Sequence, residues 1–461
     1  MLNGCVYYGD IHRNSQEINN TSLGIHHTYR SSQSSQSSQS STTIGYPWWN
    51  RFNDPLLNQL ITIALQDSPT IQIAKTRVQT AQYLTEAASS TLLPSIDLNG
   101  SIQRQRFSAS GLIPPPFNGK TYNIGELGLN FNYEFDFWGK NRELIQSKMS
   151  IEQATQAELA ESQLVLSTAV AETYFQLMNN TEQLKIAQEE VQVNNKLFQL
   201  IQDRMHHGIE SDIPVQTLLA NIQQAKQSAA YYKQATSISR NQLAVLLGKN
   251  PFTTDILTKS FSFHSYSISL PTSFPAHLLV NRPDITAAKL WAESAAHEVN
   301  IAKARFFPDI NLSALLSYQS IELSNLFTAP NRNNAIMGVI DLPIFDAGLR
   351  RANLKVQYAQ YDFAVNEYNQ TILTALREVA DQISLLNKVD AQLKAQTTSY
   401  SAIYHNYQLY FLRYQHGITD YTHILEMKNA TLKQKAAQLE LQTQYAKTVV
   451  ALLKALGGKD V

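Results

Sequence analysis

The chain lacks several features on which other protein classes depend. Among its 461 residues there is a single cysteine, Cys5, so the chain cannot form an internal disulfide bond. Basic and acidic residues number 37 each, and this balance argues against a general nucleic-acid-binding protein. No segment reaches about 18 consecutive apolar residues, so we expect no transmembrane helix.

Catalytic and metal-binding motifs are also missing. The chain has no HExxH motif, no paired-cysteine metal spacing and no GxSxG motif. Gly119-Lys120-Thr121 lacks the earlier glycine that a phosphate-binding loop needs. The histidine pairs His26-His27 and His206-His207 have no convincing metal-binding partners. We therefore expect no enzymatic activity, no cofactor and no metal site.

Two long segments, 140–207 and 349–416, contain neither glycine nor proline and are rich in helix-forming residues. Each follows a glycine and ends at another, as helices often do. At the α-helical rise per residue, each helix would extend roughly 100 Å. Apolar residues recur every seventh position, which is typical of a left-handed coiled coil: Val170, Leu177, Leu184, Val191, Phe198 and Met205, then Val379, Leu386, Leu393, Tyr400, Tyr407 and Tyr414.

The companion core position of the seven-residue pattern is mostly polar in the first segment, with Thr181, Gln188 and Asn195 among its residues. A dry two-stranded coiled coil would place Leu there. The pattern suits a helix packed sideways in a layer of helices with one face toward water. The alternative is an ordinary bundle helix with a narrow apolar stripe.

Landmark residues recur along the chain and predict a tandem repeat. Gly139, Gly208 and Gly248 recur at one constant offset, and Pro69 and Pro94 recur at another, so that the second copies are Gly348, Gly417, Gly457, Pro283 and Pro308. We expect a Ser/Gln-rich tether in 1–46. The first repeat, 47–275, would hold short helices, a β-hairpin (96–138), a long helix (140–207), a return helix (212–248) and an equatorial insert (250–275). The second repeat, 276–461, would hold a helix (284–307), a β-hairpin (309–345), a long helix (349–416) and a return helix (418–456).

Strict alternation of apolar and polar residues predicts the strands. It is clearest in 122–138, where aromatic and aliphatic residues share one face and acidic and amide residues share the other. Strands of this length fit a tilted membrane-spanning β-strand, whereas the alternative is a soluble sheet with one buried face. A four-stranded sheet in lipid would leave two edges with unsatisfied backbone groups, so several chains must close one barrel.

A sequence resemblance supports the same architecture. The chain resembles the TolC-like outer-membrane efflux proteins, specifically their lipid-anchored drug-efflux branch, over 47–457. The motifs that carry the resemblance are Trp48-Trp49-x-x-Phe52-x-Asp54-Pro55-x-Leu57, Leu93-Pro94-Ser95, Phe135-Asp136-Phe137-Trp138-Gly139-Lys140, Arg282-Pro283-Asp284-Ile285 and Pro343-Ile344-Phe345-Asp346-Ala347-Gly348, together with the duplicated hairpin turns.

The resemblance implies a fold that is mostly α with transmembrane β. A long α-helical barrel would continue a β-barrel built from four strands per chain, and three chains would form the trimer. It also implies a passive exit duct across periplasm and outer membrane for drugs or other small toxic molecules. The partners would be a periplasmic adaptor, an inner-membrane RND-type transporter and outer-membrane lipid, with no nucleic acid.

Leu2-Asn3-Gly4-Cys5 resembles the end of a bacterial lipoprotein signal, although the hydrophobic segment that usually precedes such a cysteine is missing. The family resemblance makes Cys5 the expected site of acylation, with palmitate for example. The location would then be the outer membrane of a Gram-negative cell, with the helices in the periplasm.

Family members close their periplasmic end near the second hairpin turn. Counted from Gly417, the linking tyrosine falls on Tyr414, an acidic ring position on Glu426, and the other ring position on His423. The position that bears Arg in the family is Thr419 here, and Asp420 could supply charge instead. The turns expected to contact the adaptor are Gly208-Ile209 and Gly417-Ile418.

Two other functions remain open from the sequence. One is an outer-membrane channel for type I protein secretion. The other belongs to a different class, a membrane-anchored structural coiled-coil stalk, and would show no conductance.

Overall fold

The computed structural model describes residues 47–252 and 282–458. Cys5, the tether and most of the predicted equatorial insert lie outside these residues. The described residues fall into two compact units, which cut across the predicted repeats. One unit comprises 76–156 and 287–369, and the other comprises 47–75, 157–252, 282–286 and 370–458.

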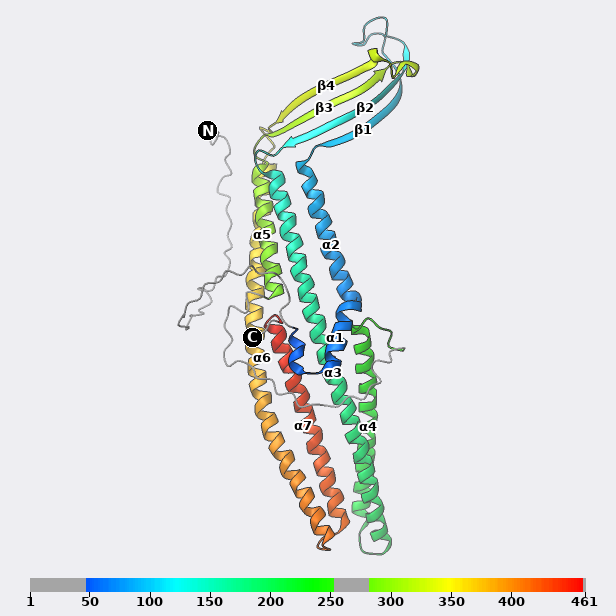
Figure 1. Cartoon of the computed structure of the whole chain (residues 1–461), viewed down its shortest axis with the longest axis vertical. Coiled ribbons are helices and arrows are strands. Elements are labelled where there is room, and N and C mark those ends of the chain that lie inside the picture. Colours follow the sequence, from blue (N-terminus) through cyan, green and yellow to red (C-terminus); the bar gives the residue numbers. More distant parts are fainter. Residues whose placement is uncertain (1–46, 253–281, 459–461) are drawn as a thin grey trace, which may run out of the picture. The chain divides into compact units, whose positions relative to one another are not determined.

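Four helices make up most of the chain. The long helices α3 (Lys140–His206) and α6 (Leu349–Gln415) have 67 residues each, and α4 (Asp212–Leu246) and α7 (Tyr421–Ala455) have 35 each. Figure 1 shows α4 returning beside α3 and α7 returning beside α6. The predicted start of the last helix at 418 was three residues too early, because Asp420 caps α7 and Ile418 still belongs to the turn.

Shorter helices precede each hairpin. They are η1 (Trp48–Phe52), α1 (Pro55–Asp67), α2 (Pro69–Ser89), η2 (Ser90–Leu92) and α5 (Pro283–Ala304), and the short η5 (Leu323–Asn325) and η6 (Ala329–Asn331) lie in the second hairpin loop. The helix predicted to reach 307 ends earlier, because the amides of Phe306 and Phe307 bond to carbonyls three residues back, as in a turn. Within the described residues, no helix combines the length and apolar character needed to cross a membrane.

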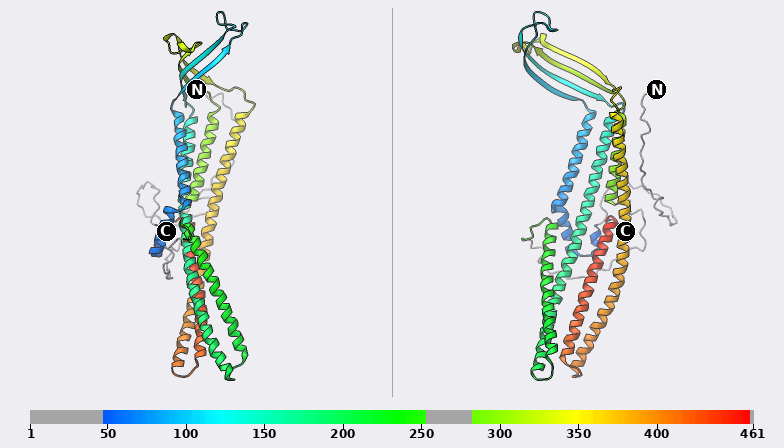
Figure 2. Two further views of the ribbon diagram at one scale, coloured as in Figure 1. Left: turned by 90° about the vertical axis from the view of Figure 1, so that its right-hand side faces the viewer. Right: turned by 180° about the vertical axis from the view of Figure 1, so that it is seen from behind.

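One antiparallel sheet contains all four strands in the order β1-β2-β3-β4. The strands are β1 (Ser95–Arg106), β2 (Thr121–Phe135), β3 (Asp309–Ser320) and β4 (Arg332–Asp341). Each predicted hairpin forms, and β2 pairs with β3 to join the hairpins from the two halves of the chain. In the right-hand view of Figure 2 the four strands lie side by side in one curved layer.

The largest apolar core lies in the second unit and includes the start of the described chain. Trp48 is 3% exposed, and its indole Nε1 donates to Ser167 Oγ in α3. The Asp54 carboxylate accepts amides of the first turn of α1 and the hydroxyl of Tyr174 at 2.7 Å. Trp48 and Asp54 thus attach the first helices to α3 by burial and by hydrogen bonds.

Candidate functional site

The sheet has one continuous apolar face. The register places Ile96 opposite Phe131, Phe131 opposite Ala314, and Ala314 opposite Ile336. Cross-strand partners share a face, so the four alternating patterns found separately in the sequence meet on the same side. That face comprises Ile96, Leu98, Ile102, Leu127, Leu129, Phe131, Tyr133, Phe135, Ile310, Leu312, Ala314, Leu316, Tyr318, Ile336 and Ile340.

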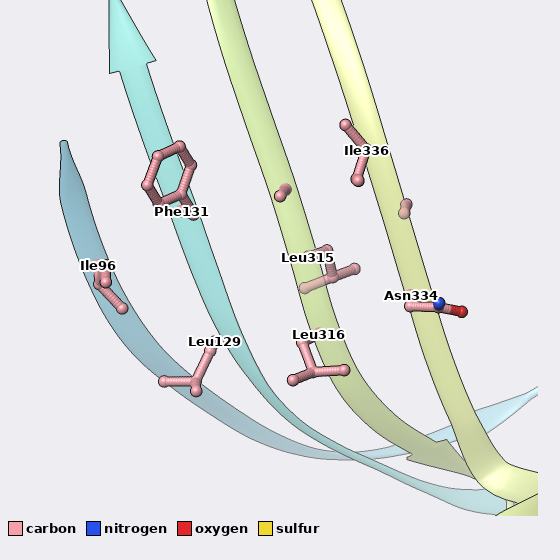
Figure 3. Close-up of a pocket in the computed structure, with 9 residues that line it drawn as sticks. Ile96, Leu129, Phe131, Leu315, Leu316, Asn334 and Ile336 are labelled. Atoms are coloured by element: carbon pink, nitrogen blue, oxygen red, sulfur yellow. The ribbon is translucent and has the colours of Figure 1, made fainter.

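Much of this apolar face is open in the single chain. Ile96 is 65% exposed, Leu316 61% and Ile336 81%. A groove of about 570 Å³ is lined mostly by residues of this face, together with Leu315 and Ala335 from the alternate positions of β3 and β4 (Figure 3). Contiguous exposed apolar surface of this kind marks contact with lipid or with another protein.

The opposite face is more polar in the first hairpin than in the second. Asp97 pairs with Asn130, and Ser313 Oγ donates to Asn132 Oδ1 at 3.0 Å. In β3 and β4, Leu315 and Met337 occupy positions on this polar side. The strict alternation of the first hairpin is therefore relaxed in the second.

The two outer edges of the sheet have no strand partner. Within 47–252 and 282–458, β1 pairs only with β2, and β4 pairs only with β3. The outward-facing N–H and C=O groups of these strands therefore need partners from outside the described residues or from water.

Each strand-to-helix junction is fixed by an Asp and an Arg. Asp136 accepts the amides of Asn141 and Arg142 and the Arg142 Nε at 3.2 Å. Asp346 accepts the amide of Arg350 and its Nε at 2.7 Å. Since both carboxylates cap the start of a long helix, they set how the strand enters it.

The two predicted adaptor-contact turns have the same backbone. Gly208 and Gly417 have φ values of 72° and 70°, the left-handed region that suits glycine. Ile209 N donates to Arg204 O and Ile418 N to Arg413 O, which closes a Schellman motif at each helix end. Ile209 is 65% exposed and Ile418 63%, so each turn presents an apolar side chain at its surface.

The structure brings together two of the four predicted gate residues. The Asp420 carboxylate accepts the His423 amide, and the His423 ring Nδ1 lies 2.7 Å from the same Oδ1. Tyr414 instead packs against Tyr421, with ring centroids 5.4 Å apart. Glu426 is exposed, and among the described residues it makes no hydrogen bond or ion pair with Tyr414, Asp420 or His423.

Sequence reasoning missed Arg204, which binds Asp420 from the other helical hairpin, α3–α4. Arg204, in the last turn of α3, donates from NH1 to Asp420 Oδ2 at 2.9 Å. His423 also stacks on Tyr410 of α6, with an interplanar angle of 8°. The sequence offered one signal that could have identified Arg204: Arg204 and Arg413 both lie four residues before a turn glycine.

Along their shared length, α3 and α7 are joined by polar contacts as well as apolar ones. Asn179 donates to Glu440 at 2.9 Å, and Gln183 donates to the Ala436 carbonyl at 2.8 Å. Nearer the turns, Asn429 donates to Asn194 and Lys428 pairs with Glu189. Leu425, Leu432 and Leu439 pack with Ile186 and Val193 in the same interface.

Comparison with known proteins decides the family. A family model described as outer membrane efflux protein matches residues 60–249 and 274–458, which is most of the chain. The chain belongs to the outer membrane efflux protein family. Its function is therefore efflux at the outer membrane.

Relatives in the same family carry drug-resistance names. The chain is 28% identical over 419 residues to "Putative multidrug resistance outer membrane protein MdtQ" of Escherichia coli (strain K12), covering 89% of this chain and 87% of the relative. It is 26% identical to "Multidrug resistance outer membrane protein MdtP" of the same strain, covering 90% and 87%.

Solved structures have the same fold. The outer membrane protein VceC from Vibrio cholerae matches with a TM-score of 0.78 and 32% identity, covering 90% of this chain and 100% of that one. The Campylobacter jejuni CmeC outer membrane channel, at 23% identity, matches with a TM-score of 0.82, covering 97% and 94%. The efflux family, rather than a structural stalk, accounts for the long helices.

Proposed function

We propose that three copies of this efflux protein form one passive exit duct for drugs or other small toxic molecules. Each copy would contribute four strands to a closed β-barrel and its long helices to a helical barrel. In this proposal the chain comprises two tandem repeats, 47–275 and 276–461. No bond is made or broken, because the chain supplies a water-filled path and a gate.

The observation that carries this proposal is the sheet with an exposed apolar face and two unpaired edges. Hydrocarbon cannot satisfy the backbone groups of β1 and β4 at those edges. Pairing β4 of one copy with β1 of the next removes every edge when the ring closes. A ring of three matches the trimer that the family resemblance implies.

The proposed partners follow from the helices and from the family. A periplasmic adaptor would contact the turns at Gly208-Ile209 and Gly417-Ile418, where both isoleucines are more than half exposed. An inner-membrane RND-type transporter would supply the energy. Acylation of Cys5 would add a lipid anchor to the barrel.

The proposed gate lies at the second hairpin turn and comprises Tyr414, Asp420, His423 and Glu426. Three copies would bring three sets of these residues around one opening. Acidic and neutral groups there would favour passage of cations and neutral molecules over anions.

Two measurements test the duct. We expect the purified protein to have the mass of a trimer in detergent and to produce discrete conductance steps in a planar bilayer. A monomer with ordered strands and no conductance would refute the duct and favour the stalk. Restored drug resistance in a strain that lacks its own outer-membrane channel would favour drug efflux, whereas restored export of a secreted protein would favour type I secretion.

A further inference from the structure

Three arginines lie just past the apolar face of the sheet. Arg104 and Arg106 are at the end of β1, and Arg332 is the first residue of β4. β1 begins after α2 and β4 ends before α6, so all three arginines lie at the end of the sheet that carries the hairpin loops (Figure 1). We call these three residues the basic rim.

The strand register places the basic rim on the apolar side of the sheet. Arg104 and Arg106 continue the alternating positions of Ile102 on β1. Arg332 is opposite Tyr318, which belongs to the apolar face. The face is therefore apolar near the helices and basic at its loop end.

The basic rim carries positive charge that the chain does not neutralise. All three arginines are exposed, and within 47–252 and 282–458 none of them forms an ion pair. Arg332 Nε donates to the Tyr318 hydroxyl at 3.3 Å, a neutral partner that leaves the charge in place. The carboxylates of β1 and β2 all lie on the polar side of the sheet: Asp97, Glu126 and Glu134.

The height of the apolar face puts the basic rim at a membrane surface. The strand from Ile96 to Arg104 rises about 26 Å at the usual spacing per residue, or about 20 Å along the membrane normal when tilted. This is close to the apolar band of outer-membrane barrels, about 25 Å tall. Tyr318 packs against Phe327 of the loop, with ring centroids 5.8 Å apart, and aromatic side chains gather at such surfaces.

The stagger of the strands brings the two parts of the basic rim to one level. One row of the sheet consists of Gly100, Leu127, Tyr318 and Arg332, and β1 continues four positions beyond it, from 100 to 104. At the helix end, β4 continues four positions beyond the row of Ser95, from 337 to 341. β4 is therefore displaced lengthwise by the same amount at both ends, as strands of a tilted barrel are. Since both strands meet helices at their other ends, this displacement places Arg332 level with Arg104.

We propose that Arg332 of one copy and Arg104 and Arg106 of the next form a binding site for a phosphate group of an outer-leaflet lipid. This inference rests on the proposed closed barrel, in which β4 of one copy pairs with β1 of the next, and it adds a lipid partner. The planar guanidinium group binds phosphate through two parallel hydrogen bonds. The acyl chains of the same lipid would lie along the apolar face below, so headgroup and chains would contact one continuous surface.

Native mass spectrometry of the delipidated full-length protein in detergent tests this site, with diphosphorylated lipid A as the probe. We expect one lipid at each of the three seams of the wild-type trimer. Arg332→Gln, and Arg104→Gln combined with Arg106→Gln, should each weaken binding about tenfold, because each removes charge-assisted hydrogen bonds to phosphate. Lipid A without its phosphates should bind the wild-type protein as weakly as diphosphorylated lipid A binds these variants. Inorganic phosphate should not compete, since it lacks the acyl chains.

Two control variants separate the site from general charge. Lys120→Gln also removes a positive charge at the loop end, but Lys120 precedes Thr121, the partner of Arg106, and so alternates to the polar side. We expect it to leave lipid binding unchanged. Arg104→Lys combined with Arg106→Lys keeps the charge without the planar group, so its loss should be smaller than that of the glutamine pair.

Mixed trimers test whether the site lies between copies. The Arg332→Gln chain keeps its β1 arginines, and the chain with Arg104→Gln and Arg106→Gln keeps Arg332. Any mixed trimer of the two contains one seam with all three arginines, whereas neither variant trimer contains any. We therefore expect one tightly bound lipid in each mixed trimer.

Separate outcomes identify which proposal fails. A wild-type trimer that binds lipid A as its variants do, or in which inorganic phosphate displaces the lipid, would overturn the lipid site and leave the duct intact. Loss of tight binding in the mixed trimers would overturn a site shared between copies. Spectra that show only monomers of the wild-type protein would overturn the closed barrel itself.

Discussion

The two helical hairpins, α3–α4 and α6–α7, have the same backbone turn but different side-chain contacts. Gly208 and Gly417 share φ values near 70° and the same amide-to-carbonyl bonds. Arg204, in contrast, crosses to Asp420, whereas Arg413 stays over a tyrosine of its own hairpin. The turn is fixed by a backbone that only glycine adopts without strain, while exposed side chains can change without altering it.

The segments around Gly248 and Gly457 likewise share a backbone conformation but differ in their side-chain contacts. Gly248 and Gly457 both have positive φ, and each packs against the residues that precede a helix-starting proline. A Cβ at Gly248 would meet the Asp67 carbonyl oxygen at 2.7 Å, and one at Gly457 would meet Arg282 Cα at 3.3 Å. Between these similar backbones, Ser68 in one half corresponds to the buried Arg282 in the other.

The largest expected difference in stability is between variants of Arg282 and of Ser68, the residue at the matching position. Arg282 donates to Asp284, Glu378 and the Ala455 carbonyl, so Arg282→Met leaves two carboxylates and a carbonyl without their partner. We expect a loss of about 2–4 kcal/mol of unfolding free energy. Guanidinium unfolding followed by circular dichroism in detergent would measure it.

Ser68→Ala is the control for that change. Within 47–252 and 282–458 its hydroxyl makes no hydrogen bond, so we expect a loss of unfolding free energy below about 1 kcal/mol. Equal losses in the two variants would show that Arg282 contributes packing alone.

The next largest effect on stability distinguishes Gly248, which packs against Asp67, from Gly208, which lies in the turn after α3. Gly248→Ala combines a positive φ with a backbone collision, and we expect it to destabilise the protein by about 2–3 kcal/mol. Gly208→Ala has the same φ but nothing within 4 Å of the added carbon, so we expect about 1 kcal/mol. The same unfolding assay compares them, and a reversed order would contradict the packing at Asp67.

A smaller effect distinguishes the two helix caps. Asp420 accepts an amide of the first turn of α7, so Asp420→Ala should cost about 1 kcal/mol of local stability. Ser211→Ala should change little, because Ser211 makes no such bond. Hydrogen exchange in the first turns of α7 and α4 measures both, and equal protection losses would show that the caps are equivalent.

The smallest expected effect concerns ion block of the pore. Glu426→Gln combined with Asp420→Asn should weaken block by divalent or trivalent cations about threefold, since negative charge near the opening concentrates cations. Glu210→Gln with Asp212→Asn, at the first turn, is the matched control. Unchanged block in the first double variant would remove these two residues from the gate.

Much of the secondary structure could be predicted from local patterns. The absence of glycine and proline located α3 and α6 to within a residue, because helix termination depends on nearby backbone chemistry. The start of α7 and the end of α5 were misplaced by three residues, because a side-chain cap and a tight turn decided them. The strands could also be predicted from their alternating pattern, but the pattern does not show which strands are neighbours in the sheet.

The contacts among the candidate gate residues could be predicted only in part, and their role as a gate stays a prediction. Asp420 and His423 could be located by their distance from Gly417, and the structure places them in contact. Arg204 could not be assigned, because no sequence pattern states which of two equivalent arginines crosses to the other hairpin. The stacking of Tyr410 on His423 could not be predicted either, because α6 contains several tyrosines.

The amino-acid sequence was enough to place the helices, the strands and the glycine turns, since each of these depends on residues close together in the chain. The three-dimensional structure was needed to show that β2 pairs with β3 to form one apolar face. It was also needed to show that Arg204, rather than Arg413, reaches a carboxylate 216 positions away. Both outcomes depend on distances between segments far apart in the chain, and local periodicity carries no information about such distances.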